Sequence, residues 1–164
     1  MKKMLFLIFS LLFPVLVFGH GKHKHGEEKA PAPAKVEPTV LEEVSASYKK
    51  SVAPIFEKKC FDCHSSQTVY PWYYKVPGVG AIMNSHIKEA RSHIDMTKGF
   101  PFKGHGGPEG DLKEIISVVE KDMMPPWYYT PFHKNSKLTE EEKKEILAWA
   151  KDSLKLMDEQ KRSQ

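Results

Sequence analysis

Cys60-Phe61-Asp62-Cys63-His64 is the stretch around which the rest of the chain is organised. It has the form C-x-x-C-H, the attachment pattern of a c-type haem. Two cysteines three residues apart lie on one face of a helical turn, so both sulfurs can bond to one planar porphyrin. The adjacent histidine then offers an imidazole nitrogen to the iron. The motif predicts one covalently bound haem c per chain, attached through Cys60 and Cys63, with His64 as the proximal ligand.

The same residues fit two other kinds of site. A C-x-x-C pair can be a thioredoxin-like redox dithiol or half of a zinc site. Zinc requires about four ligands, and the chain contains 2 cysteines. A redox dithiol is expected within a βαβ pattern, which the flanking sequence does not show. Haem attachment is therefore the favoured interpretation.

Residues 1–19 have the pattern of an export signal. Two lysines precede an apolar run that ends at Phe18, and cleavage is expected near Gly19. The run is shorter than the roughly 20 residues that span a bilayer, and it contains Pro14. We expect a periplasmic or otherwise exported protein. Membrane association is expected only through an uncleaved leader or a partner complex.

A histidine-rich and then Ala/Pro-rich stretch follows the leader, at residues 20–43. Such a composition cannot bury enough apolar surface to fold, and it predicts a flexible tether. Its histidines could bind a transition metal, although a solvated tail is the favoured interpretation. These histidines are His20, His23 and His25.

Length and charge favour one small domain. The chain has 164 residues and a net charge of +4, of which two units come from the leader lysines, leaving +2. A nearly neutral domain gives no support to nucleic-acid binding. We expect the haem-binding domain to occupy residues 44–158 and a frayed tail to occupy residues 159–164.

Apolar residues recur at helical spacing along most of this domain, which predicts an all-α fold. Met83, Ile87 and Ala90 form one such stripe. A Thr139-x-x-Glu142 capping box marks the start of the last helix. The expected helices begin near Leu41, Pro54, Gly80, Pro108 and Thr139.

The sequence also offers a sixth ligand for the iron. In Met123-Met124-Pro125-Pro126, the residue before the first proline is forced out of helical geometry, and the prolines stiffen the segment. Met124 is therefore the expected distal ligand, with Met123 as an alternative sulfur. His86, on the edge of a predicted helix, is the alternative that would give bis-histidine ligation.

Three further side chains are candidates for contact with the porphyrin. Tyr70 and Trp72 follow the motif closely and could pack on the ring or hydrogen-bond a propionate, although ordinary core packing explains them equally well. Arg91 could pair with a propionate, because guanidinium binds carboxylate in a bidentate manner. A surface arginine is an equal alternative.

From about Val52 to Lys151, the chain resembles the single-haem, c-type haem-binding domain family of exported bacterial proteins. The family usually has glycine where Ala90 stands and an acidic residue where Met123 stands. The resemblance implies haem c, a cytochrome c-like helical fold and a role in electron transfer. It rests on the haem motif, Tyr70-Pro71-Trp72-Tyr73, the segment from His86 to Arg91, Met124-Pro125-Pro126 and the segment from Lys137 to Lys143.

These observations predict an exported monohaem c-type cytochrome that carries single electrons between redox partner proteins and is not an enzyme. One alternative is a peroxidase-like haem enzyme, or a gas or redox sensor, with an open or bis-histidine distal site. In that case His86 or His105 would line the distal pocket. A third class, a non-haem metal-handling protein, would use the tether histidines and the dithiol.

Overall fold

The computed structural model describes residues 36–164, so the predicted leader and the tether histidines lie outside the described residues. The described chain is mostly helical, which confirms the all-α prediction. Its elements are α1 (Pro38–Lys50), α2 (Ala53–Lys59), α3 (Phe61–His64), η1 (Trp72–Lys75), α4 (Val79–His93), β1 (Ile94–Asp95), β2 (Lys103–Gly104), α5 (Gly107–Glu120), η2 (Thr130–Phe132) and α6 (Glu140–Arg162).

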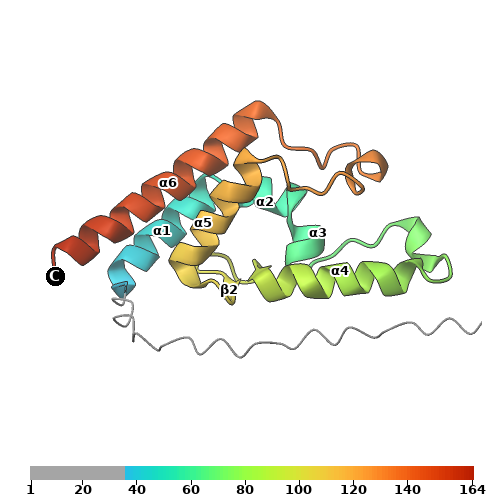
Figure 1. Ribbon diagram of the computed structural model, residues 1–164, viewed down its shortest axis with the longest axis horizontal. Helices are drawn as coiled ribbons and strands as arrows, with labels where there is room; N and C mark the ends of the chain where they lie inside the picture. The colour runs from blue at the N-terminus through green and yellow to red at the C-terminus, as the bar shows by residue number, and fades with distance from the viewer. Residues whose placement is uncertain (1–35) are drawn as a thin grey trace, which may run out of the picture. The chain divides into compact units, whose positions relative to one another are not determined.

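Helices α1, α5 and α6 lie side by side, and α2 continues from the end of α1 (Figure 1). Their core is a cluster of five aromatic rings with centroids between 5.3 and 6.5 Å apart. Each such ring removes about 150–250 Å² from water, so this cluster dominates the burial. We call these helices and residues 96–102 the closed region. The rings belong to Tyr48, Phe56, Phe100, Phe102 and Trp149.

Helix α1 begins inside the range predicted as tether. The prediction that residues 20–43 form a tether is therefore wrong for its last residues, from Pro38 onward. Proline is favourable at the first turn of a helix because its missing N–H needs no partner there. The backbone N–H of Glu37 also donates to Gln160 Oε1 at 3.1 Å, which ties this helix start to α6.

Helix α6 is longer than predicted. Residues 159–162 are helical rather than frayed, because Lys161 forms an ion pair with Glu109 of α5. At the other end the predicted capping box is confirmed: Thr139 Oγ1 accepts from the Glu142 N–H at 3.1 Å, and Glu142 Oε2 accepts from the Thr139 N–H at 2.8 Å. Among residues 36–164, no helix is both long and apolar enough to span a membrane.

Helix α4 packs on the short α3, and none of its residues is fully buried. Its predicted stripe of Met83, Ile87 and Ala90 is only half-buried. The chain then turns through a two-residue antiparallel bridge in which Ile94 pairs with Gly104. A Cβ on Gly104 would lie 2.0 Å from the His93 carbonyl oxygen, so glycine is required at this close approach.

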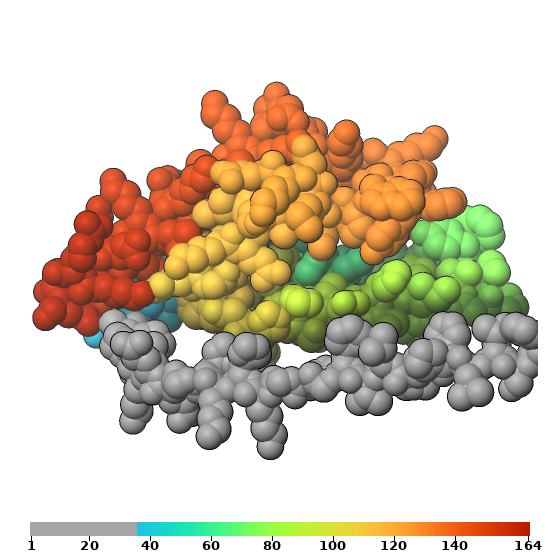
Figure 2. Space-filling model, viewed as in Figure 1, coloured from blue at the N-terminus to red at the C-terminus, as the bar shows by residue number. Residues whose placement is uncertain are grey.

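Large exposed apolar side chains gather around α3. We call α3, α4, residues 65–78 and the 121–138 loop the open region. Figure 2 shows the teal atoms of the α2–α3 segment in a hollow between the orange 121–138 loop and α4. Among the described residues, every exposed large hydrophobic side chain belongs to this region: Val69, Tyr70, Trp72, Val76, Ile82, Met123, Met124, Trp127, Tyr128 and Phe132.

Candidate haem-binding site

The C-x-x-C-H motif forms one helical turn. Cys60 separates α2 from α3, and its carbonyl oxygen accepts hydrogen bonds from the N–H groups of Cys63, at 3.1 Å, and His64, at 2.9 Å. Both cysteines are half-buried free thiols. This turn places the two sulfurs and the imidazole on one short segment, as covalent attachment of a single planar group requires.

The electrostatics of the thiols oppose the two other kinds of site. Burial, followed by the neighbouring Cys63, raises the pKa of the Cys60 thiol to about 12. Burial also raises the pKa of Cys63. Redox-active dithiols have lowered pKa values, because the thiolate is the nucleophile. Within residues 36–164, no group of three or more His, Cys, Asp or Glu side chains is placed to hold a metal ion.

His64 is oriented as a metal-ligating histidine would be. Its Nδ1 lies 2.9 Å from the Ile94 carbonyl oxygen, and because a carbonyl can only accept, Nδ1 carries the proton. Burial lowers the pKa of His64, which keeps the ring neutral. The Nε2 lone pair is then available for iron. A backbone carbonyl on the second ring nitrogen is the usual support of a metal-bound imidazole.

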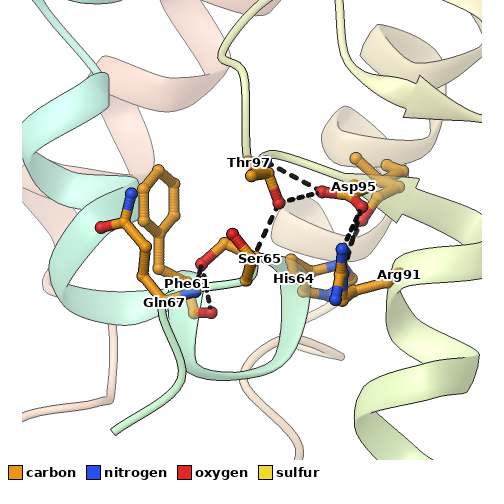
Figure 3. Close-up of polar contacts among 9 residues, drawn as sticks. Phe61, His64, Ser65, Gln67, Arg91, Asp95 and Thr97 are labelled. Atoms are coloured by element: carbon orange, nitrogen blue, oxygen red, sulfur yellow. Dashed lines mark hydrogen bonds and ion pairs between the residues drawn. The ribbon is translucent and has the colours of Figure 1, made fainter.

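The residues after the motif are fixed by short polar contacts (Figure 3). Ser65 is fully buried and its hydroxyl donates to the Phe61 carbonyl oxygen at 2.9 Å. The Ser66 N–H donates to Thr97 Oγ1 at 3.0 Å. These contacts hold the end of α3 against the segment after β1, so the orientation of His64 depends on both.

Arg91 is engaged by a protein carboxylate. Its Nε and Nη2 both donate to Asp95 Oδ2, at 3.1 and 2.8 Å (Figure 3). Burial acts to raise the pKa of Asp95, but the hydrogen bonds from Thr97 and the pairing with Arg91 lower it overall. The Asp95 carboxylate therefore stays charged. The predicted contact of Arg91 with a propionate stays a prediction.

A mainly apolar pocket opens beside Cys63. One wall comes from α4, with Met83, His86 and Ile87, and the opposite wall comes from the 121–138 loop. His86 faces Tyr128 across it, with ring centroids 5.7 Å apart. The remaining lining residues are Asp62, Thr68, Val69, Pro71, Pro126, Tyr129 and His133. The mainly apolar lining suits one face of a haem beside Cys63, whereas Cys60 and His64 do not line this pocket.

The predicted distal sulfurs lie on the loop that forms one wall of the pocket. Met124 is 39% exposed, and Met123 is more exposed. Neither lines the pocket, whereas Pro126, two residues after Met124, does. Assignment of Met124, Met123 or His86 as distal ligand stays a prediction.

The other sequence candidates are spread over the open region. The Tyr70 hydroxyl contacts Asn84 at 3.4 Å, and Trp72 is 81% exposed. His105 lies outside the pocket, where its Nε2 is 2.9 Å from His93 Nδ1. The structure therefore brings His86 to the pocket with Cys63 and leaves His105 apart from them.

Three residues of the site were not predicted from the sequence. Asp62 occupies a variable position of the motif, yet its side chain hydrogen-bonds two loops. Tyr129 and His133 line the pocket from the 121–138 loop. Their sequence signal is weak, because they lie in an aromatic stretch without periodicity.

Comparisons with known proteins agree with this geometry. Residues 21–152 match the family model described as a haem-binding domain. The chain is 33% identical over 95 residues to the cytochrome c peroxidase Ccp of Escherichia coli (strain K12), a match that covers 57% of this chain. It spans only 20% of that relative's length. No solved structure matches the chain. With a match over most of its length, the chain belongs to the haem-binding domain family.

Proposed function

We propose that the protein is a monohaem c-type cytochrome that carries single electrons and is not an enzyme. The observation that carries the proposal is the Cys60–His64 turn, where two free thiols share a helical turn with an imidazole whose Nδ1 is held by a backbone carbonyl. In this proposal Cys60 and Cys63 each form a thioether with one haem c, and His64 is the proximal ligand.

The chain's own residues would hold the group and shield it from water. A bound haem supplies the one-electron couple of its iron. Ile94 fixes the His64 ring through its carbonyl oxygen, and Met83 and Ile87 of α4 present apolar surface beside Cys63. Exclusion of water from such a site limits solvent reorganisation during electron transfer, and the exposed rim leaves an edge through which a partner can exchange electrons.

We propose Met124 as the distal ligand, with Met123 and His86 as the alternatives. Met124 lies at the start of the 121–138 loop, close in sequence to Pro126, which lines the pocket. Thioether ligation gives a higher reduction potential than bis-histidine ligation, so the choice of ligand sets the potential.

The test is the optical spectrum of the full chain purified from a host that attaches haem c. An iron–thioether bond gives a weak near-infrared absorption band in the ferric protein. We expect this band in the wild type, its loss in Met124→Ala and its retention in Met123→Ala. A low-spin spectrum without the band in the wild type would instead favour His86, to be checked with His86→Ala.

A second candidate is a peroxidase-like haem enzyme or a sensor. It is favoured by the similarity to a cytochrome c peroxidase and by the presence of His86 and His133 in the pocket. With an open sixth position, this candidate predicts a high-spin ferric spectrum and rapid reaction with peroxide or a diatomic gas. With His86 as distal ligand, it predicts a low-spin spectrum without the near-infrared band. The electron-carrier proposal predicts a six-coordinate, low-spin iron and neither reaction.

The cellular setting is proposed from the sequence. We propose that the protein is exported with the help of residues 1–19 and exchanges electrons with redox partner proteins. Expression of the full chain, followed by fractionation and N-terminal sequencing, tests the export step. A chain that begins near His20 in the exported fraction supports it, and an unprocessed cytoplasmic chain contradicts it.

A further inference from the structure

The Asp62 carboxylate connects the haem motif to both flanking segments. Its Oδ1 accepts a hydrogen bond from the Val69 N–H at 3.0 Å, and its Oδ2 accepts one from the Tyr129 hydroxyl at 2.8 Å. Burial, followed by the hydrogen bond to Asp62, raises the pKa of Tyr129, so its hydroxyl remains a donor. A hydrogen bond to a charged acceptor is among the stronger ones in proteins. Asp62 therefore ties Tyr129 directly to the turn that carries both thiols.

His133 extends this connection to the other side of the pocket. Its ring stacks on that of Tyr129, with centroids 3.7 Å apart and planes 9° from parallel. Its Nδ1 lies 3.1 Å from the Tyr129 carbonyl oxygen and must donate to it, so Nε2 is left as an acceptor. The Tyr73 hydroxyl lies 3.3 Å from Nε2 and donates to it. We call Asp62, Tyr73, Tyr129 and His133 the clasp.

The clasp holds a part of the 121–138 loop that is otherwise weakly attached. The loop is anchored at its start by the Asp122–Lys143 ion pair of 2.5 Å and near its end by Lys59, whose Nζ donates to the Asn135 carbonyl oxygen at 2.6 Å. Among residues 36–164, the hydrogen bonds that join residues 124–134 to residues outside the 121–138 loop are the two in the clasp. The neighbouring Trp127 is 83% exposed, whereas Tyr129 and His133 are half-buried.

We propose that Asp62, Tyr129 and His133 are positioning residues that hold the 121–138 loop over the haem and so present the Met124 sulfur to the iron. This inference rests on the proposed function. Met124 follows the anchored start of the loop, where the Met123 N–H donates to the Val118 carbonyl oxygen at 2.9 Å, and the clasp fixes the loop on the other side of Met124. Loss of the clasp would leave Met124 held from one side, and a more mobile ligand is replaced more easily. The second variable residue of the C-x-x-C-H motif thus links haem attachment to distal ligation.

The first test compares two Tyr→Phe variants of the haem-bearing full chain. Tyr129→Phe keeps the ring that stacks on His133 and removes only the hydroxyl. Tyr74→Phe is the matched control, because it removes an open-region hydroxyl that contacts Asn84, at 3.0 Å, rather than the motif. In both variants the band is followed while the pH is raised until another ligand displaces the sulfur. We expect Tyr129→Phe to lose the band about one pH unit earlier than the wild type, which corresponds to about tenfold weaker binding of the ligand. A Tyr129→Phe band and potential equal to those of Tyr74→Phe would overturn the proposal.

A coupling measurement sharpens this test. In an Asp62→Ala background, where the acceptor is already absent, Tyr129→Phe should cause no further shift. Equal shifts in both backgrounds would mean that the hydroxyl acts through some other contact, and the clasp would be wrong.

A separate readout distinguishes failure of the clasp from failure of the Met124 assignment. Amide hydrogen exchange reports opening of the 121–138 loop whatever the ligand. If the wild type lacks the near-infrared band, Tyr129→Phe should still exchange amides of residues 124–134 about tenfold faster than Tyr74→Phe does. That result keeps the positioning role and rejects the ligand, whereas equal exchange rates reject the positioning role.

Discussion

The closed and open regions differ in how their apolar side chains are covered. In the closed region, five aromatic rings bury one another, and Phe56 is 2% exposed. In the open region, ten large apolar side chains within residues 69–82 and 123–132 remain exposed, although they lie close to the haem motif. Monomeric proteins rarely leave so much apolar surface in one place without a ligand or partner for it. The difference indicates that one half of the domain supplies its own core and the other half is shaped around a cofactor.

The largest expected effect comes from removal of haem attachment. Cys60→Ala/Cys63→Ala should leave the closed region folded and loosen the open region, because only the latter depends on the porphyrin. Amide hydrogen exchange of the haem-bearing wild type and of this variant checks the prediction. We expect α5 and α6 to stay protected in both, and α4 to lose protection in the variant. Uniform loss of protection in all helices would show that the two regions form one cooperative unit.

Two phenylalanines, one in each region, allow the contribution of apolar packing to stability to be compared between the closed and open regions. Phe56→Ala should lower the free energy of unfolding by about 3–5 kcal/mol, because it opens a cavity in the closed region. Phe132→Ala, at an exposed site of the open region, should change it by less than about 0.5 kcal/mol in the haem-free chain and by more in the haem-bearing chain. Chemical denaturation of both variants, with and without haem, tests this. If Phe132→Ala changed the free energy of unfolding equally in the haem-free and haem-bearing chains, Phe132 would not contribute to packing around the haem.

Asp111 lowers the stability of the closed region when its carboxyl group is ionised. It is 0% exposed, and neither carboxylate oxygen has a hydrogen-bond partner among residues 36–164. Burial, followed by the nearby Glu114, raises its pKa from 3.8 to about 6, while His105 acts to lower it. Because the folded state binds this proton more tightly than the unfolded state, its stabilising contribution is complete below the unfolded pKa. That contribution is lost as the pH rises through about 6.

Asp111→Asn should therefore flatten the pH dependence of stability between about pH 4 and 6. It should also raise the free energy of unfolding at pH 7 by at most about 3 kcal/mol, the equivalent of a shift of two pKa units. Denaturation of the wild type and the variant across this pH range provides the measurement. Parallel curves for the two proteins would mean that Asp111 has an ordinary pKa. Such a result would mean that Asp111 does not destabilise the closed region at neutral pH.

The smallest expected effect concerns the start of α6. Thr139→Ala removes the side-chain oxygen that accepts from the Glu142 N–H, and should cost about 1 kcal/mol of stability. Since α6 belongs to the closed region, the loss should be equal with and without haem. Thermal melts of both forms test this, and a loss seen only in the haem-bearing form would show that the cap serves the open region.

The sequence predicted those parts of the molecule that depend on local rules. The helical turn of the C-x-x-C-H motif and the capping box at Thr139 follow from spacing alone. Two helix ends were missed because they depend on distant contacts: Glu37 with Gln160, and Lys161 with Glu109. The clasp was missed for the same reason, since Asp62 and Tyr129 are 67 residues apart in the chain.

The central claim is that the open region carries one covalently attached haem, and intact mass spectrometry of the denatured full chain tests it most directly. Protein from a host that attaches haem c should have the mass of the polypeptide plus one haem. The Cys60→Ala/Cys63→Ala variant from the same host should have the mass of the polypeptide alone. A wild-type chain without the added mass, or a variant that retains it, would contradict the claim.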